Sequence, residues 1–327
     1  MSAGRDDSAE KVVDPKVVIC TRLQHPSDRG MNRLIDSSRR QIRRTASFLG
    51  FPIGRYEVKA VSFPKSGRTW VEVMVARVYE LLTGIPVAQL VKNKPRMLID
   101  RVSRKRLRII RHGHGTRFRH FVRDGVFPRD DYRGLRVALQ VRDPRDVLVS
   151  NYYYHKYQHQ AFTGSMHDFI RFPYWEAEPD TKLSFAGIDP IINYYNAWIE
   201  NQDVFSSFLV IRYEDFHTDP LGTLGELFDF ANVAVSDEQL ADAIEYASFD
   251  NMRNMETSQK LEWIGLPGAN DRHGLKTRRG QVGGYREELQ SEDLAYVDRA
   301  IRERLSPFFH AYRESIGNHD ITASTED

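Results

Sequence analysis

The sequence has little cysteine, little net charge and no long apolar run. One of its 327 residues is cysteine, Cys20, so no internal disulfide can form and nothing indicates an oxidising compartment. The formal net charge is +2, which argues against bulk electrostatic binding to nucleic acid or to an anionic membrane. No stretch approaches the ~20 apolar residues that span a bilayer, and the first residues lack the apolar segment of a secretory signal. We therefore expect a cytoplasmic protein with no nucleic-acid partner and no integral membrane segment.

The composition suits one large folded domain. Hydrophobic residues make up 41% of the chain and charged residues 28%, which predicts a sizeable core and a well-solvated surface. No repeat or low-complexity linker divides the sequence. We predict a partly flexible N-terminal extension over 1–54, a single domain over 55–313 and a flexible tail over 314–327. The basic stretch within 30–50 is interpreted as a solvated helix face, with a membrane or partner contact as the alternative.

Strands and helices alternate along the predicted domain. Four apolar runs read as strands: EVKAVSF, RLRII, LRVALQV and SFLVIRY. A helix is expected from about Thr69 to Leu82, ending at Gly84, and another begins at Pro144, with Asp143 as its N-cap. This alternation predicts an α/β fold, in which a central parallel sheet is flanked by helices on both faces.

The segment Pro64-Lys65-Ser66-Gly67-Arg68-Thr69-Trp70 joins the first strand to its helix. A glycine turn that enters a helix can bind an anion, because backbone N–H groups and the helix dipole both point at it. Lys65 adds a mobile charge, and Ser66 and Thr69 add hydroxyl groups. The loop is not GxxxxGK[ST], since its lysine precedes the glycine. A purely structural turn is the alternative reading.

Two further segments suit anions. Arg142 follows the strand LRVALQV at the edge where open α/β sheets bind ligands, and Ser150 lies about two turns into the next helix. The alternative for Arg142 is a salt bridge to a nearby aspartate. Arg278, Arg279 and Gly280 combine paired charge with a glycine-freed backbone, and a ligand-free surface loop is the alternative there. Three anion sites predict a ligand with phosphates at more than one position.

Together these segments resemble the cytosolic-type sulfotransferases. PKSGRTW resembles their 5′-phosphosulfate loop PKSGTTW, and VALQVRDPRDVLVS resembles their 3′-phosphate segment. RRGQVGGYREEL is similar to their late R-K-G-x-x-G-D-W-K motif, and LVIRYEDF is similar to their tyrosine-bearing strand. The four segments occur in the family's order, which implies its P-loop-like sulfotransferase fold.

The resemblance implies 3′-phosphoadenosine 5′-phosphosulfate (PAPS) as sulfuryl donor, adenosine 3′,5′-bisphosphate as product, and no metal. It assigns the 5′ side of the donor to one run of residues: Lys65, Ser66, Gly67, Arg68, Thr69 and Trp70. It assigns the 3′-phosphate to a second set: Arg142, Ser150, Arg278, Arg279 and Gly280. Trp70, Tyr213 and Phe249 match positions that surround adenine.

The sequence departs from the family at four places. Arg68 stands where threonine is usual, Ala247 where a hydroxyl is common, and Gly284-Tyr285 where Asp-Trp is usual. The fourth departure concerns the general base, because the family's lysine-threonine-histidine is replaced by RIIRHGHG. An ungapped match places Gly113 on the expected histidine, between His112 and His114. Relatives that look bacterial often carry the histidine at the end of this strand, so we predict His112 as the base, with His114 as the second choice.

The mechanism that the resemblance implies needs no covalent enzyme intermediate. The histidine takes the acceptor's proton, Lys65 stabilises the leaving phosphate together with the amides from Ser66 to Trp70, and Arg111 assists at the sulfuryl oxygens. The acceptor is a small-molecule, lipid or carbohydrate hydroxyl or amine, held by variable loops expected at 85–100, 155–187 and 255–275. The aromatic stretches NYYYHKYQHQ and RFPYWEAEP either line that pocket or belong to the core.

Two other functions stay open at this point. One is a P-loop kinase that uses ATP and Mg²⁺; the other is a catalytically inactive nucleotide-binding protein of the same fold. The oligomeric state is also open, with a homodimer as one alternative.

Overall fold

The computed structural model describes residues 57–177, 181–258 and 275–315. The predicted extension 1–54 lies outside these residues, together with Cys20 and the basic stretch within 30–50. The predicted tail from 314 onward lies almost wholly outside them.

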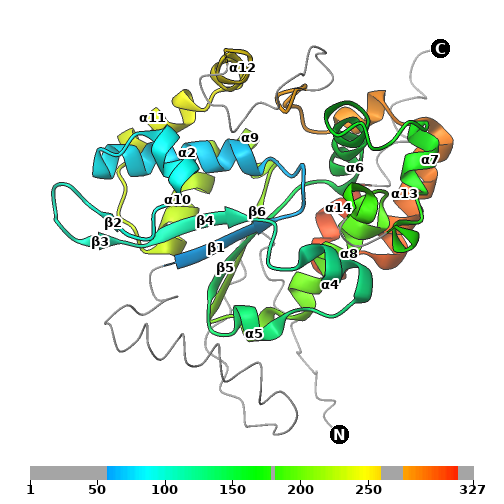
Figure 1. Cartoon of the computed structure of the whole chain (residues 1–327), viewed down its shortest axis with the longest axis horizontal. Coiled ribbons are helices and arrows are strands. Elements are labelled where there is room, and N and C mark those ends of the chain that lie inside the picture. Colours follow the sequence, from blue (N-terminus) through cyan, green and yellow to red (C-terminus); the bar gives the residue numbers. More distant parts are fainter. Residues whose placement is uncertain (1–56, 178–180, 259–274, 316–327) are drawn as a thin grey trace, which may run out of the picture.

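A parallel sheet forms the centre of the molecule (Figure 1). Its four strands lie in the order β4-β1-β5-β6, and each neighbouring pair is parallel. Their bounds are β1 (Glu57–Ser62), β4 (Ile109–Gly113), β5 (Arg136–Val141) and β6 (Ser207–Arg212). Because the strands are parallel, their carboxyl ends meet at one edge. The predicted α/β fold with a central parallel sheet is confirmed.

The predicted strand RLRII is divided in two. Its first part is β3 (Arg106–Leu107), which pairs antiparallel with β2 (Leu98–Ile99) in a separate small sheet. The chain then resumes as β4, in register with β1 so that Val61 faces Gly113. This strand therefore extends further toward the histidines than the sequence predicted.

Helices cover both faces of the sheet (Figure 1). One apolar cluster contains Val58 and Ala60 of β1 with the buried sides of helices α2 (Arg68–Thr83), α3 (Val87–Asn93), α9 (Asp215–Thr218), α10 (Pro220–Ala231), α11 (Asp237–Tyr246) and α12 (Phe249–Thr257). The other contains Val61 with helices α4 (Phe118–Asp124), α5 (Arg129–Tyr132), α6 (Pro144–Tyr153), α7 (Met166–Ile170), α8 (Asp189–Glu200), α13 (Ser291–Arg304) and α14 (His310–Glu314). Side chains alternate across a strand, so both faces of β1 are buried.

Local signals fix the helix ends. Gly84 adopts a left-handed conformation with φ of 80° and donates its N–H to Glu80, which ends α2 as predicted. Asp143 accepts a hydrogen bond from the backbone of Arg145, and Pro144 takes the first helical position of α6. Beyond Tyr153 the helix widens into a π-helical turn, η1 (Tyr154–Gln158). Because α6 begins directly after β5, its cap helps to position the site at the carboxyl edge of the sheet.

Candidate functional site

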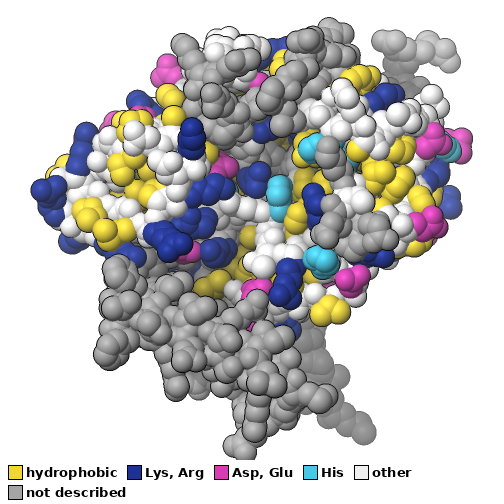
Figure 2. Space-filling view, viewed as in Figure 1, with side chains coloured by type: hydrophobic (Ala, Val, Ile, Leu, Met, Phe, Trp, Pro, Cys, Tyr) yellow, Lys and Arg dark blue, Asp and Glu magenta, His cyan; other side chains and the backbone are white. Residues whose placement is uncertain are grey.

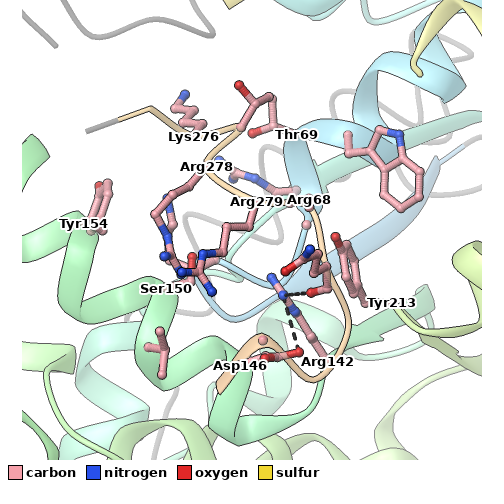
Figure 3. Close-up of a pocket in the computed structure, with 18 of the residues that line it drawn as sticks. Arg68, Thr69, Arg142, Asp146, Ser150, Tyr154, Tyr213, Lys276, Arg278 and Arg279 are labelled. Atoms are coloured by element: carbon pink, nitrogen blue, oxygen red, sulfur yellow. Dashed lines mark hydrogen bonds and ion pairs between the residues drawn. The ribbon is translucent and has the colours of Figure 1, made fainter. Parts of the chain in front are cut away.

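A cavity of about 260 Å³ lies at the carboxyl edge of the sheet. The β1–α2 turn, α6, the end of β6, α12 and the loop from Lys276 to Gly284 form its walls (Figure 3). Its lining includes most of the residues singled out from the sequence: Lys65, Gly67, Arg68, Thr69, Trp70, His114, Arg142, Ser150, Tyr213, Phe249, Arg278, Arg279 and Gly280. Segments more than 200 residues apart in the sequence therefore converge here, as the motifs predicted.

The β1–α2 turn presents an uncapped helix start to this cavity. Gly67 is the N-cap of α2 with φ of 87°, and no side chain caps the helix. Lys65 also has a positive φ, 73°. The buried side chain of Gln140 donates a hydrogen bond of 2.7 Å to the carbonyl of Ser66 and so holds the turn. An uncapped helix N-terminus leaves backbone N–H groups for an anionic ligand.

Gly67→Ala is expected to lower stability and affinity for adenosine 3′,5′-bisphosphate. A Cβ at this position would lie 2.5 Å from Cδ2 of Tyr213, so the ring must move in addition to the left-handed strain. We expect a loss of about 2–3 kcal/mol in the free energy of unfolding and ~10-fold or more in affinity. Chemical denaturation and calorimetry measure the two effects.

Gly84→Ala is the matched control. Gly84 has a similar φ of 80°, but a Cβ there meets nothing within 4 Å. Its expected cost is about 1 kcal/mol of strain alone, with unchanged affinity for the bisphosphate. Equal effects from the two substitutions would contradict the role given to the close contact with Tyr213.

Lys65 lies in a strongly cationic environment. Burial, together with neighbouring Lys276, Arg142 and Arg278, lowers the pKa of Lys65 to about 7, and Glu256 opposes this only in part. Its Nζ lies 4.8 Å from the ring centre of Tyr154, on η1. A lysine whose neighbours are mostly cations gains charge when an anion binds.

Arg142 is positioned by contacts on several sides. Its backbone N–H donates to the hydroxyl of Tyr195, and that hydroxyl donates back to the carbonyl of Arg142. Its guanidinium lies 4.2 Å from the ring centre of Tyr213, donates to the carbonyl of Gln281 and is 3.4 Å from Asp146 (Figure 3). The salt bridge to a nearby aspartate, the alternative reading of Arg142, is thus present, while the side chain still lines the cavity.

The late loop is tied to α6 through Asp146. Its carboxylate accepts hydrogen bonds from the backbone N–H groups of Gly283 and Tyr285. The Tyr285 side chain is buried, and the guanidinium of Arg145 lies 5.3 Å from its ring centre. The replacement of Asp-Trp by Gly284-Tyr285 therefore leaves a packed loop.

The two arginines of this loop point into the cavity but are paired with glutamates. Arg278 donates to Glu288 at 2.7 Å, and Arg279 donates to Glu287 at 2.7 Å. Glu288 also accepts a hydrogen bond from the hydroxyl of Tyr153. An anion that binds these arginines must share them with, or take them from, the two carboxylates.

Aromatic rings form one wall. Trp70 lies 5.6 Å from Tyr213 and 5.1 Å from His217 between ring centres, and its indole N–H donates to the carbonyl of Ala247 at 2.7 Å. The ring of Phe249 packs directly against Gly280: a Cβ added to that glycine would lie 2.6 Å from the ring. These flat apolar surfaces suit a stacked base.

The two candidate histidines are in different surroundings. His114 lines the cavity, and its Nδ1 is 2.9 Å from the carbonyl of Ser62. A carbonyl only accepts, so Nδ1 carries the proton and Nε2 keeps its lone pair. Burial, then Arg68, lowers the pKa of His114 to about 3, which keeps the ring neutral near pH 7.

His112 does not line this cavity. It is buried on the α2 face of β4, beside a separate apolar hollow of about 50 Å³, and its Nε2 makes no hydrogen bond among the described residues. Burial, then Arg68, lowers its pKa to about 3 as well. The chain bends immediately after Gly113, which brings His114 over the sheet edge toward Ser62. The preference for His112 over His114 is at odds with this geometry.

Two other predicted contributions are not found at the cavity. Arg111 is bound to Glu57 at 2.9 Å and to the carbonyl of Pro95 at 3.1 Å, and it lines the separate hollow beside His112. These contacts hold the guanidinium of Arg111 away from the cavity in this structure. The side chain of Ser66 is fully buried, so only its backbone is available to a ligand in the cavity.

Some cavity residues were missed by sequence reasoning. His217 and Lys276 line the cavity, and Asp146 and Glu288 pair with Arg142 and Arg278. The position of His217, four residues after Tyr213 and just past a strand end, was an available signal. Of the aromatic stretches, Tyr154 lines the cavity, whereas Tyr152 and Tyr174 belong to the core. The expected acceptor loop 255–275 lies mostly outside the described residues.

Positive charge gathers at this site. Figure 2 shows Lys and Arg side chains concentrated in the middle of the face, between the lobe of α2 and that of α6. Six cations line the cavity: Lys65, Arg68, Arg142, Lys276, Arg278 and Arg279. Among the described residues, no group of three or more His, Cys, Asp or Glu side chains is arranged to hold a metal ion. The arrangement favours an organic anion with several charges.

The fold is an α/β fold with a cationic cavity at the carboxyl edge of its sheet, and the family follows from sequence comparison. The sulfotransferase domain family matches residues 129–309, more than half of the chain. The chain therefore belongs to the sulfotransferase domain family, and its predicted identity as a PAPS-dependent sulfotransferase is confirmed. The segment with the β1–α2 turn and both histidines precedes the matched residues.

Named relatives agree with this family. The chain is 22% identical over 276 residues to Cytosolic sulfotransferase 13 of Arabidopsis thaliana, with 76% of each chain covered. It is 23% identical over 274 residues to Flavonol 4′-sulfotransferase of Flaveria chlorifolia, covering 76% of this chain and 79% of that protein. The fold resembles the crystal structure of mouse sulfotransferase SULT7A1 complexed with PAP, with a TM-score of 0.51, 17% identity, and coverage of 79% and 88%. None of the helices in the described part of the chain is long and apolar enough to cross a membrane.

Proposed function

We propose that this chain transfers the sulfuryl group of PAPS to a hydroxyl or amine of a small-molecule, lipid or sugar acceptor. The observation that carries the proposal is the convergence of the β1–α2 turn, Arg142 and the arginines of the late loop on one cavity with an aromatic wall. Adenosine 3′,5′-bisphosphate is the second product.

The residues of the cavity fit such a donor. The uncapped start of α2 and Lys65 suit its 5′ side, and Arg142, Ser150, Arg278, Arg279 and Gly280 suit its 3′-phosphate. The rings of Trp70, Tyr213 and Phe249 suit adenine. The buried Nε of Arg142 makes no hydrogen bond among the described residues, which favours an anion beside it. PAPS supplies an activated sulfuryl group whose leaving group is a phosphate.

His114 is the general base in this proposal, in preference to His112. Its Nδ1 is held by the carbonyl of Ser62, so Nε2 is free to take the proton of the acceptor. Its pKa is low in the protein alone, and the negative charge of a bound donor opposes Arg68 and raises it toward the working range. His112 takes no part in proton transfer.

Lys65 stabilises the leaving phosphate. Its charge, with the backbone N–H groups at the start of α2, lies at the turn where negative charge develops as the sulfuryl group departs. Preorganised donors of this kind contribute about 3 kcal/mol each in other enzymes. Arg111 has no role in this scheme, because Glu57 holds it elsewhere.

Calorimetry with adenosine 3′,5′-bisphosphate tests the nucleotide site. Arg142→Ala is expected to weaken binding by ~10- to 100-fold, because a charge-assisted hydrogen bond is lost. ADP with Mg²⁺ is the comparison ligand, since a kinase would bind it at least as tightly. Tighter binding of ADP with Mg²⁺, or unchanged binding by Arg142→Ala, would contradict the proposed donor site.

A proton is expected to be taken up when adenosine 3′,5′-bisphosphate binds at pH 8. Lys65, with a pKa of about 7 in the free protein, is mostly neutral at pH 8, and a phosphate beside it raises that pKa. Calorimetry in two buffers of different ionisation enthalpy measures the uptake, which should approach one proton and disappear in Lys65→Met. Uptake that persists in Lys65→Met would assign the proton to another group.

Turnover separates an enzyme from an inactive protein of the same fold. A single-turnover assay with labelled PAPS over phenols, alcohols, amines and sugars should give a sulfated product with at least one class. Tight binding of the bisphosphate without transfer to any class would favour the inactive alternative.

A further inference from the structure

Arg68 can serve the 5′ side of the proposed donor through its backbone N–H, as any residue at this position can, so its guanidinium is free for a further role. Arg68 is the first residue of α2, it stands where the family usually has threonine, and its side chain lies among the cations of the cavity (Figure 3). Its Nε is buried and makes no hydrogen bond, and Arg68 forms no ion pair among the described residues. A buried guanidinium nitrogen without a partner is costly, so a ligand group is expected beside it.

The other cations already account for the proposed donor. Arg142, Arg278 and Arg279 surround the position proposed for the 3′-phosphate, and Lys65 with the helix N-terminus serves the 5′ side. Those three arginines are each bridged to a carboxylate: Arg142 to Asp146, Arg278 to Glu288 and Arg279 to Glu287. Arg68 differs from them because no described carboxylate lies within ion-pair distance of it.

The end of the cavity that holds the proposed base is positively charged. Lys65, Arg68, His114 and Tyr154 line it. The guanidinium of Arg119 lies 5.8 Å from the ring centre of Phe118, whose ring is in turn 5.3 Å from that of His114. Thus two arginines, from α2 and from α4, approach the base from different elements.

The charged groups that lower the pKa of His114 are all cations. After burial, Arg68 is the largest influence that lowers the pKa of His114; Arg119 and Lys94 lower it further, and the hydrogen bond to Ser62 raises it. Burial raises the pKa of Tyr154, and the same two arginines, Arg119 and Arg68, oppose that shift. The largest charge effects on these two side chains therefore come from cations.

We infer that the acceptor is itself an anion: a molecule with a carboxylate, phosphate or sulfate that binds Arg68 while its hydroxyl faces Nε2 of His114. This inference rests on the proposed function and names the acceptor class for the same site. A forked guanidinium binds such groups through two parallel hydrogen bonds, which fixes the orientation of the acceptor. A neutral acceptor leaves Nε of Arg68 unpaired beside the base.

Acceptors matched in shape but not in charge test the inference. The pairs are 4-hydroxyphenylacetate and its methyl ester, 4-hydroxyphenyl phosphate and 4-methoxyphenol, and glucuronate and glucose. The full chain is assayed with PAPS, and kcat/KM is compared within each pair. We expect the anionic member to be preferred by about 10- to 100-fold in at least one pair, mainly through KM.

Arg68→Thr should bring the ratio of kcat/KM for the anionic member to kcat/KM for the neutral member close to one, and Arg68→Lys should keep part of the preference. Arg133→Thr is the matched control, because Arg133 precedes the amino end of β5 and pairs with exposed Asp130 far from the carboxyl edge. Its ratio should equal that of the unaltered chain. Binding of adenosine 3′,5′-bisphosphate is measured for each variant, so that a loss of donor affinity is seen separately from a loss of acceptor preference.

Three results would overturn the inference. Equal or better turnover of the neutral member in every pair would refute an anionic acceptor and leave the sulfotransferase proposal intact. A charge preference that survives in Arg68→Thr would refute the role of Arg68. If neither these pairs nor the uncharged panel is sulfated although the bisphosphate binds, the proposed function fails and the inference fails with it.

Discussion

His114→Ala is expected to lower kcat by ~10²–10⁴-fold, the usual contribution of a general base. His114 lines the cavity, and its Nδ1–H donates a hydrogen bond to the carbonyl of Ser62, so Nε2 keeps the lone pair that can accept a proton. Folding and affinity for adenosine 3′,5′-bisphosphate should change little. Single-turnover measurements with saturating PAPS report the chemical step directly.

His112→Ala is the control for this prediction. The two histidines are two residues apart and have similarly lowered pKa values, yet His112 is buried away from the cavity. Its removal should cost stability, about 1–3 kcal/mol from the space left in the core, while kcat stays within a few-fold. A large loss of kcat in His112→Ala with little change in His114→Ala would restore His112 as the base.

Lys65→Met is expected to lower kcat by ~10²-fold or more, since one preorganised charge at the leaving phosphate is worth about 3 kcal/mol. Methionine keeps much of the side-chain volume, and the cationic surroundings of Lys65 become less repulsive without it. The variant should therefore fold at least as stably as the original chain.

Donors with different leaving groups distinguish this role from a general loss of binding. If Lys65 stabilises the leaving phosphate, Lys65→Met should make the rate more sensitive to the basicity of that leaving group. An equal loss of kcat/KM for donors with good and poor leaving groups, with kcat unchanged, would show that Lys65 contributes to donor affinity alone.

The positions of the segments that line the cavity followed from sequence because they depend on local chemistry. Gly67 permits a left-handed turn, Asp143 caps a helix that begins with Pro144, and both features lie next to apolar strands. Parallel strands bring their carboxyl ends together, so the turn and Arg142 had to meet at one edge.

The assignment of the base could not be made in the same way. His112 and His114 would share a face if β4 continued, and the bend after Gly113 separates them. Glycines on both sides of His114 permit such a bend without fixing where it falls. The contacts of the late loop were also hidden, because Glu288 pairs with Arg278 and Asp146 binds the backbone of Gly283 only in the folded chain.

The hydrogen bonds of Asp146 affect how much of the late loop must rearrange when a nucleotide binds. One carboxylate on α6 fastens two backbone N–H groups of a segment almost 140 residues further along the chain. That segment is consequently shaped before any nucleotide arrives, so little conformational entropy is lost on association. In the proposed complex, the backbone of this loop therefore keeps the conformation it has in the free protein, and only the side chains of Arg278 and Arg279 exchange Glu288 and Glu287 for the phosphate.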